Sequence, residues 1–281
     1  MLHLTSDLAY WIQERYNIKL RREAGLPKPW SSDKVFQSVR FCNVHREDDK
    51  VTVWIRQNWN RPKHPAWMFV LARMLNLIDT LGSIADHSDV VDDPDGQDFS
   101  GLKEGLKAIR SEGTKVFTSA YTISTCGKSM DKIDYVVDWV CQRVKDLPND
   151  ENPLTCEHMQ KRLTRVDGLG SFLAAQVVAD MKNTVGHPLS HAPDFWSFSA
   201  PGPGSLRGLS WYFYGSSKGV TESRYTESLV NCRSEVDPLI PGHIPRISDQ
   251  DFQNCLCEFS KYMKVFKDPN AHVRNHYPGH A

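Results

Sequence analysis

Two helical sequence patterns meet at a pair of glycines, and this junction constrains the fold more than any other feature of the chain. The residues before Gly168 and those after Gly170 both have helical spacing, so the chain must turn between two helices. Glycine reaches backbone conformations closed to other residues. The first turn of the second helix directs free N–H groups outward at its positive dipole end. The segment Gly168, Leu169, Gly170 and Ser171 is therefore a candidate phosphate site, although tight helix packing explains the spacing equally well.

The overall composition predicts a folded chain with a substantial core. Of the 281 residues, 40% are hydrophobic, which suits one large domain or two packed lobes. The 34 basic and 34 acidic residues give a net charge of zero, so bulk charge does not indicate a nucleic-acid-binding protein. The charges are nevertheless segregated, because the first 64 residues have a basic surplus and the stretch from Asp79 to Asp98 is strongly acidic.

The cysteines and the hydropathy pattern indicate the cellular environment in which the chain is expected to fold. Seven cysteines without any CxxC spacing argue against a zinc site and a disulfide framework, so we expect a reducing cytoplasm. No apolar run of about 18 residues occurs, so we expect neither secretion nor a membrane span. No carboxylate or histidine cluster has convincing metal-ligand spacing, so no residue is assigned as a metal ligand.

Apolar residues recur at helical spacing along most of the chain, which predicts an all-α fold. The first helix is expected to turn Arg15, Lys19, Arg21 and Arg22 outward, and the helix that starts at Pro65 is expected to be the central core helix. Further helices are expected at about 34–40, 46–59, 99–109, 130–145, 155–165, 171–183 and after Ser248. We expect residues 1–150 to form an N-terminal helical lobe and 151–281 an active-site lobe, in one integrated enzyme domain.

The glycine junction and a downstream aspartate together resemble a known superfamily. Asp194 follows Gly170 by 24 positions, about one helix and one loop later. This layout resembles the helix-hairpin-helix DNA glycosylases, in which the hairpin holds a DNA phosphate and the aspartate faces a flipped base. The resemblance implies a helix-hairpin-helix, glycosylase-like helical fold. The duller alternative is that Asp194 caps a helix that begins after Pro193.

Four sequence blocks carry a second resemblance, which spans nearly the full length. The blocks are Lys19–Trp30, Arg40–Asp49, Pro201–Leu209 and Asp251–Tyr262. Together they are similar to the alpha-glutamyl/putrescinyl thymine pyrophosphorylases, or amino acid:DNA transferases, of DNA-modifying phages. That family implies displacement of pyrophosphate from pyrophosphorylated 5-hydroxymethyl-uracil in double-stranded DNA by an amino acid or polyamine. It also implies coupling to a 5-hydroxymethyl-uracil DNA kinase, in the host cytoplasm.

Residues in these blocks suit that chemistry. Arg207 is expected to lie in a glycine-rich loop and to meet the departing pyrophosphate, because Gly202, Gly204 and Gly208 let the backbone approach an anion closely. Carboxylates must deprotonate the incoming amine, and Asp194, Asp49 and Glu258 are the candidates. Further candidates for holding pyrophosphate are Arg40, Asn43, Arg46 and Lys261. No cofactor is required by this logic, and a divalent metal stays open.

Each assignment has a structural alternative. Arg40, Asn43, Arg46 and Asp49 could instead form a buried polar network, and Glu258 with Lys261 a surface ion pair. The function itself has two alternatives: a DNA glycosylase that acts on modified uracil, and a non-catalytic DNA-binding subunit of a modification complex.

Overall fold

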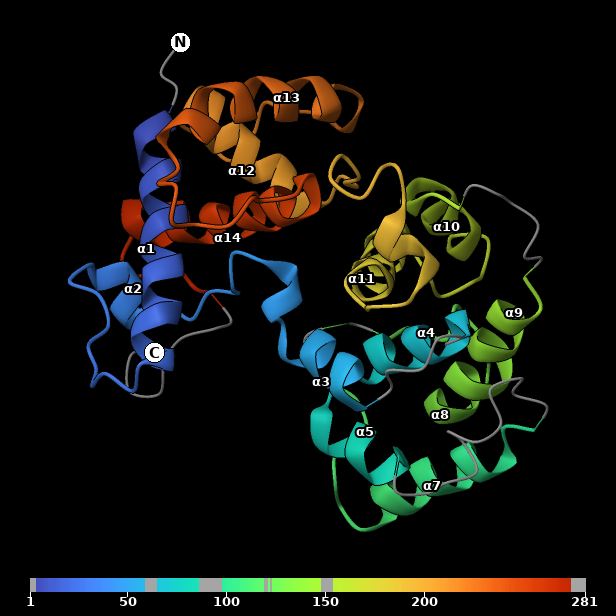
Figure 1. Ribbon diagram of the computed structural model, residues 1–281. Coiled ribbons are helices and arrows are strands. Elements are labelled where there is room, and N and C mark those ends of the chain that lie inside the picture. Colours follow the sequence, from blue (N-terminus) through green and yellow to red (C-terminus); the bar gives the residue numbers. More distant parts are fainter. Residues whose placement is uncertain are drawn as a thin grey trace. The chain divides into compact units, whose positions relative to one another are not determined.

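The computed structural model describes residues 4–58, 65–85, 98–118, 121, 123–147 and 154–273. Within these ranges the regular structure is helical and there is no strand (Figure 1), so the predicted all-α class is confirmed. The chain divides into two units. Unit 1 combines Met1–Arg46 with Ser199–Ala281, and unit 2 is Glu47–Phe198. This division differs from the single boundary expected near residue 150, because the first helices pack against the last ones.

Unit 1 is built from the two ends of the described chain. Its α-helices are α1 (Thr5–Glu23), α2 (Lys34–Ser38), α12 (Pro203–Tyr214), α13 (Tyr225–Val236) and α14 (Asp249–Lys267). In Figure 1, α1 crosses α14, and the two helices are in contact. The start of α14 is fixed by Ser248, whose Oγ accepts the Asp251 N–H at 3.3 Å. Sequence reasoning predicted that Ser248 or Asp249 opens this helix, and the structure assigns the cap to Ser248.

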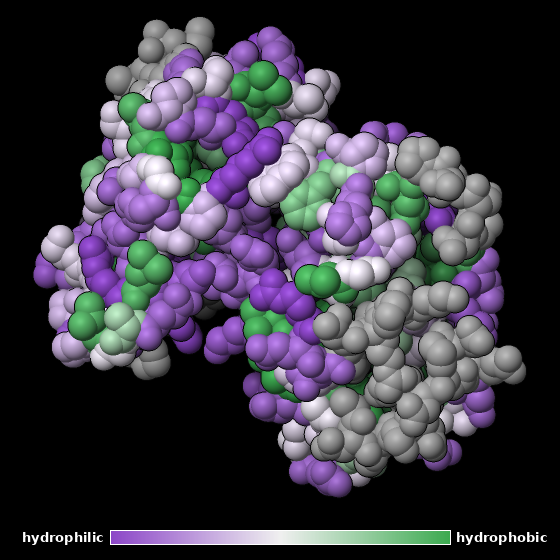
Figure 2. Space-filling model, viewed as in Figure 1, coloured by the Kyte–Doolittle hydropathy of each residue, from purple (hydrophilic) through white to green (hydrophobic). Residues whose placement is uncertain are grey.

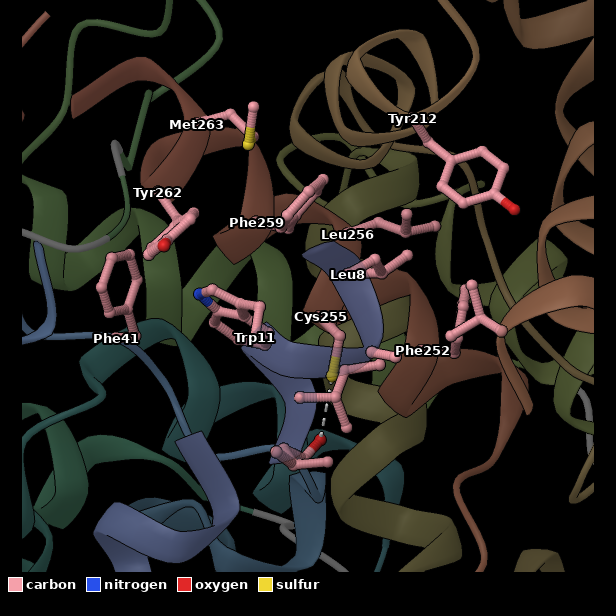
Figure 3. Close-up of a cluster of buried hydrophobic side chains, with 14 of the residues drawn as sticks. Leu8, Trp11, Phe41, Tyr212, Phe252, Cys255, Leu256, Phe259, Tyr262 and Met263 are labelled. Carbon is pink, nitrogen blue, oxygen red and sulfur yellow. Dashed lines mark hydrogen bonds between the residues drawn. The ribbon is translucent and has the colours of Figure 1, made fainter. Parts of the chain in front are cut away.

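The core of unit 1 is aromatic. Leu8, Trp11 and Ile12 are fully buried on one face of α1, as their spacing of three and four residues predicts. Figure 3 shows Trp11 among side chains of α14 and the segment that follows α2. The dashed line there joins the Cys255 Sγ to the carbonyl oxygen of Val44, 3.8 Å apart. A segment that follows α2 is thus attached to α14 by both packing and polar contacts.

Unit 2 is arranged around one apolar helix. Its helices are α3 (Lys50–Asn58), α4 (Ala66–Leu75), α5 (Ile78–Ala85), α7 (Ser100–Ser111), α8 (Lys132–Asp134), the π-helix Tyr135–Cys141, α9 (Gln142–Lys145), α10 (Cys156–Leu163) and α11 (Ser171–Lys182). Helix α4 is buried from Trp67 to Leu75 and contacts α3, α5, α9, α11 and the π-helix. The predicted central core helix is confirmed. Its last residue is Leu75, and Asn76 follows as the C-cap with a left-handed φ of 50°.

The surface carries both hydrophilic and hydrophobic residues. In the face drawn in Figure 2, hydrophilic residues dominate the surface of unit 1, and hydrophobic residues occur in separate patches. None of the described helices has the length and hydropathy needed to cross a membrane. Much of the acidic stretch from Asp79 to Asp98 lies outside the described residues.

Candidate functional site

The glycine junction is a helical hairpin, as the sequence predicts. Helix α10 ends at Leu163, α11 begins at Ser171, and the two helices contact each other. Leu169 is buried, with 1% of its surface exposed, and its N–H donates to the Val166 carbonyl at 3.0 Å. This buried leucine anchors the turn and leaves the glycines beside it at the surface or close to it.

Gly168 is required by the fold itself. Its φ of 98° lies in the left-handed region, where a side chain strains the backbone. A Cβ at this position would lie 2.6 Å from the Tyr135 hydroxyl oxygen. That hydroxyl donates a hydrogen bond to the Asp167 carbonyl at 2.9 Å. Tyr135 therefore supports the hairpin from the π-helix, and packing alone explains this glycine.

Gly170 has no such structural reason to be glycine. Its φ of −65° suits any residue, and no atom lies within 4 Å of where a Cβ would be. The first hydrogen bond into α11 runs from the Ala174 N–H to the Gly170 carbonyl, so Ser171, Phe172 and Leu173 have no intrahelical acceptor for their N–H groups. The missing side chain leaves this positive helix end open to an approaching anion.

A polar contact holds the start of α11 in place. The Gln160 Nε2 of α10 donates to the Ser171 Oγ at 2.9 Å and to the Ser171 carbonyl at 3.2 Å. The backbone N–H groups at the helix end are thus positioned from both helices of the hairpin. Phe172, the next residue, is 43% exposed and lies beside the Tyr121 ring.

Asp194 lies at the opposite end of α10 from the hairpin. Its Oδ1 accepts the Cys156 N–H at 2.8 Å and its Oδ2 accepts the Glu157 N–H at 3.0 Å. The carboxylate therefore caps α10, where a negative charge is favourable. The alternative that Asp194 caps a helix after Pro193 is wrong, because the residues after Pro193 form turns. Asp194 does cap a helix, but that helix is α10, which begins 38 residues earlier in the chain.

Asp49 also acts as a cap. Its Oδ1 accepts the N–H groups of Val51 and Thr52 at the start of α3, at 3.1 and 3.3 Å. The same oxygen lies 3.2 Å from the Arg73 guanidinium. Asp49 thus belongs to a polar network in unit 2, together with Arg73.

The centre of that network is an ion pair that sequence reasoning missed. Arg73 of α4 and Asp180 of α11 are both buried and form a bidentate pair, and Thr52 donates to the Asp180 Oδ1 at 2.6 Å. Burial alone would lower the pKa of Arg73, but the Asp180 carboxylate, together with Tyr121 and Asp49, raises that pKa overall. The available signal was a charged residue within each of two apolar helices, Arg73 in α4 and Asp180 in α11.

Glu258 and Lys261 pair within unit 1, but not at the surface. Glu258 is 2% exposed; its Oε2 accepts the Cys42 N–H at 3.1 Å and its Oε1 pairs with the Lys261 ammonium. Burial would lower the pKa of Lys261, but the Glu258 carboxylate raises it overall. Through its hydrogen bond to Cys42, Glu258 fixes α14 to the segment that follows α2.

The block from Arg40 to Arg46 lies along α14. Asn43 accepts a hydrogen bond from Arg15, and its carbonyl accepts one from Asn254 at 3.3 Å. The Arg46 N–H donates to the Asp251 Oδ1 at 2.7 Å, whereas the Arg40 side chain is exposed. The expected outward position of Arg15 is wrong: it is 4% exposed and donates to the Phe41 and Cys42 carbonyls.

Arg207 and Gly204 lie on helix α12, not on a glycine-rich loop. Arg207 is exposed, whereas Gly204 and Gly208 face α14. A Cβ on either glycine would lie 2.1 Å from an atom of α14, the Cys257 Sγ or the Leu256 carbonyl oxygen. These glycines allow two helices to approach closely, so the expected use of their backbone to receive an anion is not supported.

The candidate residues are distributed over both units. Asp49, Asp194 and the hairpin belong to unit 2, and Arg40, Asn43, Arg46, Gly204, Arg207, Glu258 and Lys261 belong to unit 1. Within unit 1, the structure brings Asn43, Arg46, Glu258 and Lys261 onto α14 and its neighbouring segment. In the part of the chain that is described, no three His, Cys, Asp or Glu side chains lie together as a metal site would require.

Comparisons with known proteins point to a kinase family. The family model for the helical domain of 5-hmdU DNA kinases matches residues 3–271. The 5-hmdU DNA kinase of Bacillus phage SP10 is 24% identical over 227 residues, which cover 71% of this chain and 34% of that protein. The chain thus spans about a third of the length of this curated relative. No solved structure matches the chain significantly.

These findings overturn the expected function. Membership of the thymine pyrophosphorylase family is wrong, because a kinase-domain family covers nearly the whole chain. Displacement of pyrophosphate by an amine donor is withdrawn with it, as are the glycosylase and binding-subunit alternatives. The blocks that carried the resemblance, apart from Glu47–Asp49, lie in unit 1, where their described contacts hold helices together. The chain belongs to the 5-hmdU DNA kinase helical-domain family.

Proposed function

We propose that this chain takes part in the phosphorylation of 5-hydroxymethyl-uracil in DNA, as the helical domain that holds the DNA. In this reaction the hydroxymethyl oxygen of the base attacks the γ-phosphorus of a nucleoside triphosphate. The bond from that phosphorus to the β,γ-bridging oxygen breaks, the nucleoside diphosphate leaves, and the hydroxyl proton passes to a base. The catalysis then depends mainly on positioning and on charge stabilisation.

The family match over residues 3–271 carries this proposal. The sequence contains no GxxxxGK[ST] motif, the loop that cradles phosphates in many nucleotide-binding kinases. The nearest segment, Gly127-Lys128-Ser129, has Thr122 at the position of the first glycine. Lys128 lies against the Trp139 ring instead of at a helix start. We therefore assign the triphosphate site to a part of the kinase other than this helical domain.

The hairpin supplies the DNA contact in this proposal. Most protein–DNA hydrogen bonds go to phosphates and sugars, and helix N-termini are common donors. The bare backbone at Gly170 and the N–H groups of Ser171 to Leu173 offer such donors without a side chain in the way. We infer a helix-hairpin-helix phosphate site at Gly168–Ser171, and double-stranded DNA that carries 5-hydroxymethyl-uracil as the partner.

The test uses the variant Gly170→Glu. The backbone conformation and the empty space at this position tolerate a side chain, so the thermal melting temperature should stay close to that of the wild type. The new carboxylate would repel a phosphate and occlude the donors, so duplex affinity should fall at least tenfold, as loss of hydrogen bonds to a charged group worth about 1.5–3 kcal/mol implies. Gly101→Glu, at another glycine with open space, is the matched control.

Two results would contradict the proposal. Unchanged duplex affinity of folded Gly170→Glu would remove the hairpin as the phosphate site. Transfer of labelled γ-phosphate to 5-hydroxymethyl-uracil in DNA should be measured in a kinase that contains this domain, with thymine DNA as the control substrate. No transfer to the modified base would show that the assigned reaction is wrong.

A further inference from the structure

The helical segment that supports the hairpin carries charges on two different stripes. Helix α8, the π-helix and α9 run continuously from Lys132 to Lys145. One stripe is acidic and is neutralised by α7, through ion pairs of 2.6 to 2.9 Å. These pairs are Asp131 with Arg110, Asp134 with Lys107, and Asp138 with Lys103. The basic residues of α7 therefore already have partners within the protein.

The second stripe runs from the hairpin to two cations that form no ion pair with a carboxylate of the described residues. Tyr135, Trp139 and Arg143 are spaced by four residues, about one helical turn each, so they lie on one side of the segment. Tyr135 contacts the hairpin through the Asp167 carbonyl. Burial raises the pKa of its hydroxyl, and the neighbouring Cys126 thiol adds to this shift. The loop that contains Cys126 and Lys128 thus lies beside the hairpin support.

Two cations converge on Trp139. The Lys128 Nζ is 3.7 Å from the centroid of the Trp139 ring, and the Arg143 guanidinium carbon is 3.1 Å from it. Both are attracted by the ring electrons. Among the residues that the structure describes, neither cation has an ion pair, in contrast to the three basic residues of α7. We call Lys128, Trp139 and Arg143 the Trp139 cluster.

This arrangement favours a bound anion. The two cationic groups lie within about 7 Å of each other, where like charges repel, and the ring holds them there. Arg143 is exposed and Lys128 is half-buried, so a ligand can reach both. A phosphate beside them would relieve the repulsion and gain charge-assisted hydrogen bonds.

We propose that the Trp139 cluster binds a second phosphate of the DNA that the Gly170 hairpin holds. This inference rests on the proposed function, because the hairpin is what assigns DNA as the partner. The two sites share one support, since Tyr135 contacts the hairpin and Trp139 follows one turn later on the same helical segment. Holding the DNA at two phosphates fixes its direction as well as its distance.

The experiment measures duplex binding by fluorescence anisotropy over a series of salt concentrations. The variants are Lys128→Gln, Arg143→Gln and the double variant, and the controls are Lys103→Gln and Arg110→Gln on the neutralised stripe. Loss of one phosphate contact lowers the slope of log affinity against log salt by about 0.9, and because the cluster binds one phosphate, the slope of the double variant should fall by about this amount. Each single variant should bind about threefold to tenfold more weakly at low salt, and the controls should keep the wild-type slope.

The outcomes separate this inference from the proposed function. An unchanged slope in the cluster variants, with Gly170→Glu still impaired, would overturn the inference and leave the proposed function intact. Equal losses in the control variants would also overturn it, because net charge alone would then explain the effect. No DNA binding by the wild type would count against the proposed function itself. Arg143→Lys retains the positive charge, so it should keep the wild-type slope of log affinity against log salt. This variant shows that the loss in Arg143→Gln comes from the lost charge and not from a folding defect.

Discussion

The substitution Gly208→Ala tests how α12 and α14 are held together. Its Cβ would lie 2.1 Å from the Leu256 carbonyl oxygen and 2.9 Å from the Leu256 Cα, and both atoms belong to the backbone of α14. Backbone atoms cannot rotate away as a side chain does, so the helices must separate by about 1 Å. A gap of that size forfeits a quarter to a half of the contact energy between facing groups.

The expected loss follows from the side chains on these two helices. Leu209, Tyr212, Leu256 and Phe259 are fully buried and each contribute about 2 kcal/mol. Weakening their contacts costs about 2–4 kcal/mol, and the higher helix propensity of alanine returns about 1 kcal/mol. We expect a net loss of about 2 kcal/mol in the free energy of unfolding, or about 4–8 °C in the melting temperature.

Urea unfolding followed by circular dichroism measures this change, and Gly82→Ala is the matched control. Gly82 is also helical, in α5, but nothing lies within 4 Å of its would-be Cβ, so alanine should stabilise by about 0.5–1 kcal/mol. If Gly208→Ala were as stable as the wild type, the close approach of α12 and α14 would be refuted as the reason for the glycine.

Two further predictions concern α10. Asp194→Asn keeps one acceptor for the α10 N–H groups and removes the charge, so the free energy of unfolding should fall by about 1 kcal/mol; an unchanged urea midpoint would contradict the cap. Burial and the Asp194 charge raise the pKa of Cys156 from 9.0 to about 12. Because the unfolded thiol ionises first, stability should decline from about pH 9 to pH 12, with a shallower decline in Cys156→Ala; equal pH slopes would contradict this.

Local patterns predicted the elements of the fold but not their partners. The apolar runs predicted α4 as the core helix, and glycine spacing predicted the hairpin, because both depend on residues close in sequence. The position of Arg15 could not be predicted in this way. Its burial depends on two carbonyl groups about 27 residues away, and no periodicity in α1 reveals their approach.

The prediction of the candidate site was limited in the same way, because contacts between residues distant in sequence decide what its members do. From the sequence, Gly204 and Gly208 were expected to let the backbone approach an anion. Glycine serves this purpose in open loops, but it also serves close packing of helices. Only the position of α14 distinguishes these uses. Asp194 likewise caps a helix that begins 38 residues before it, a contact that sequence spacing does not encode. The Arg73–Asp180 pair was detectable in principle, since each charge interrupts an apolar helix.

The discontinuous construction of unit 1 has a consequence for synthesis on the ribosome. Cys42 and its acceptor Glu258 are 216 residues apart, and all of unit 2 is translated between them. At about 5–20 residues per second, α1 waits on the order of 10–45 s for α14. During that time the apolar face of Leu8, Trp11 and Ile12 has no native cover, so the nascent chain presents a binding site for chaperones while unit 2 can already fold.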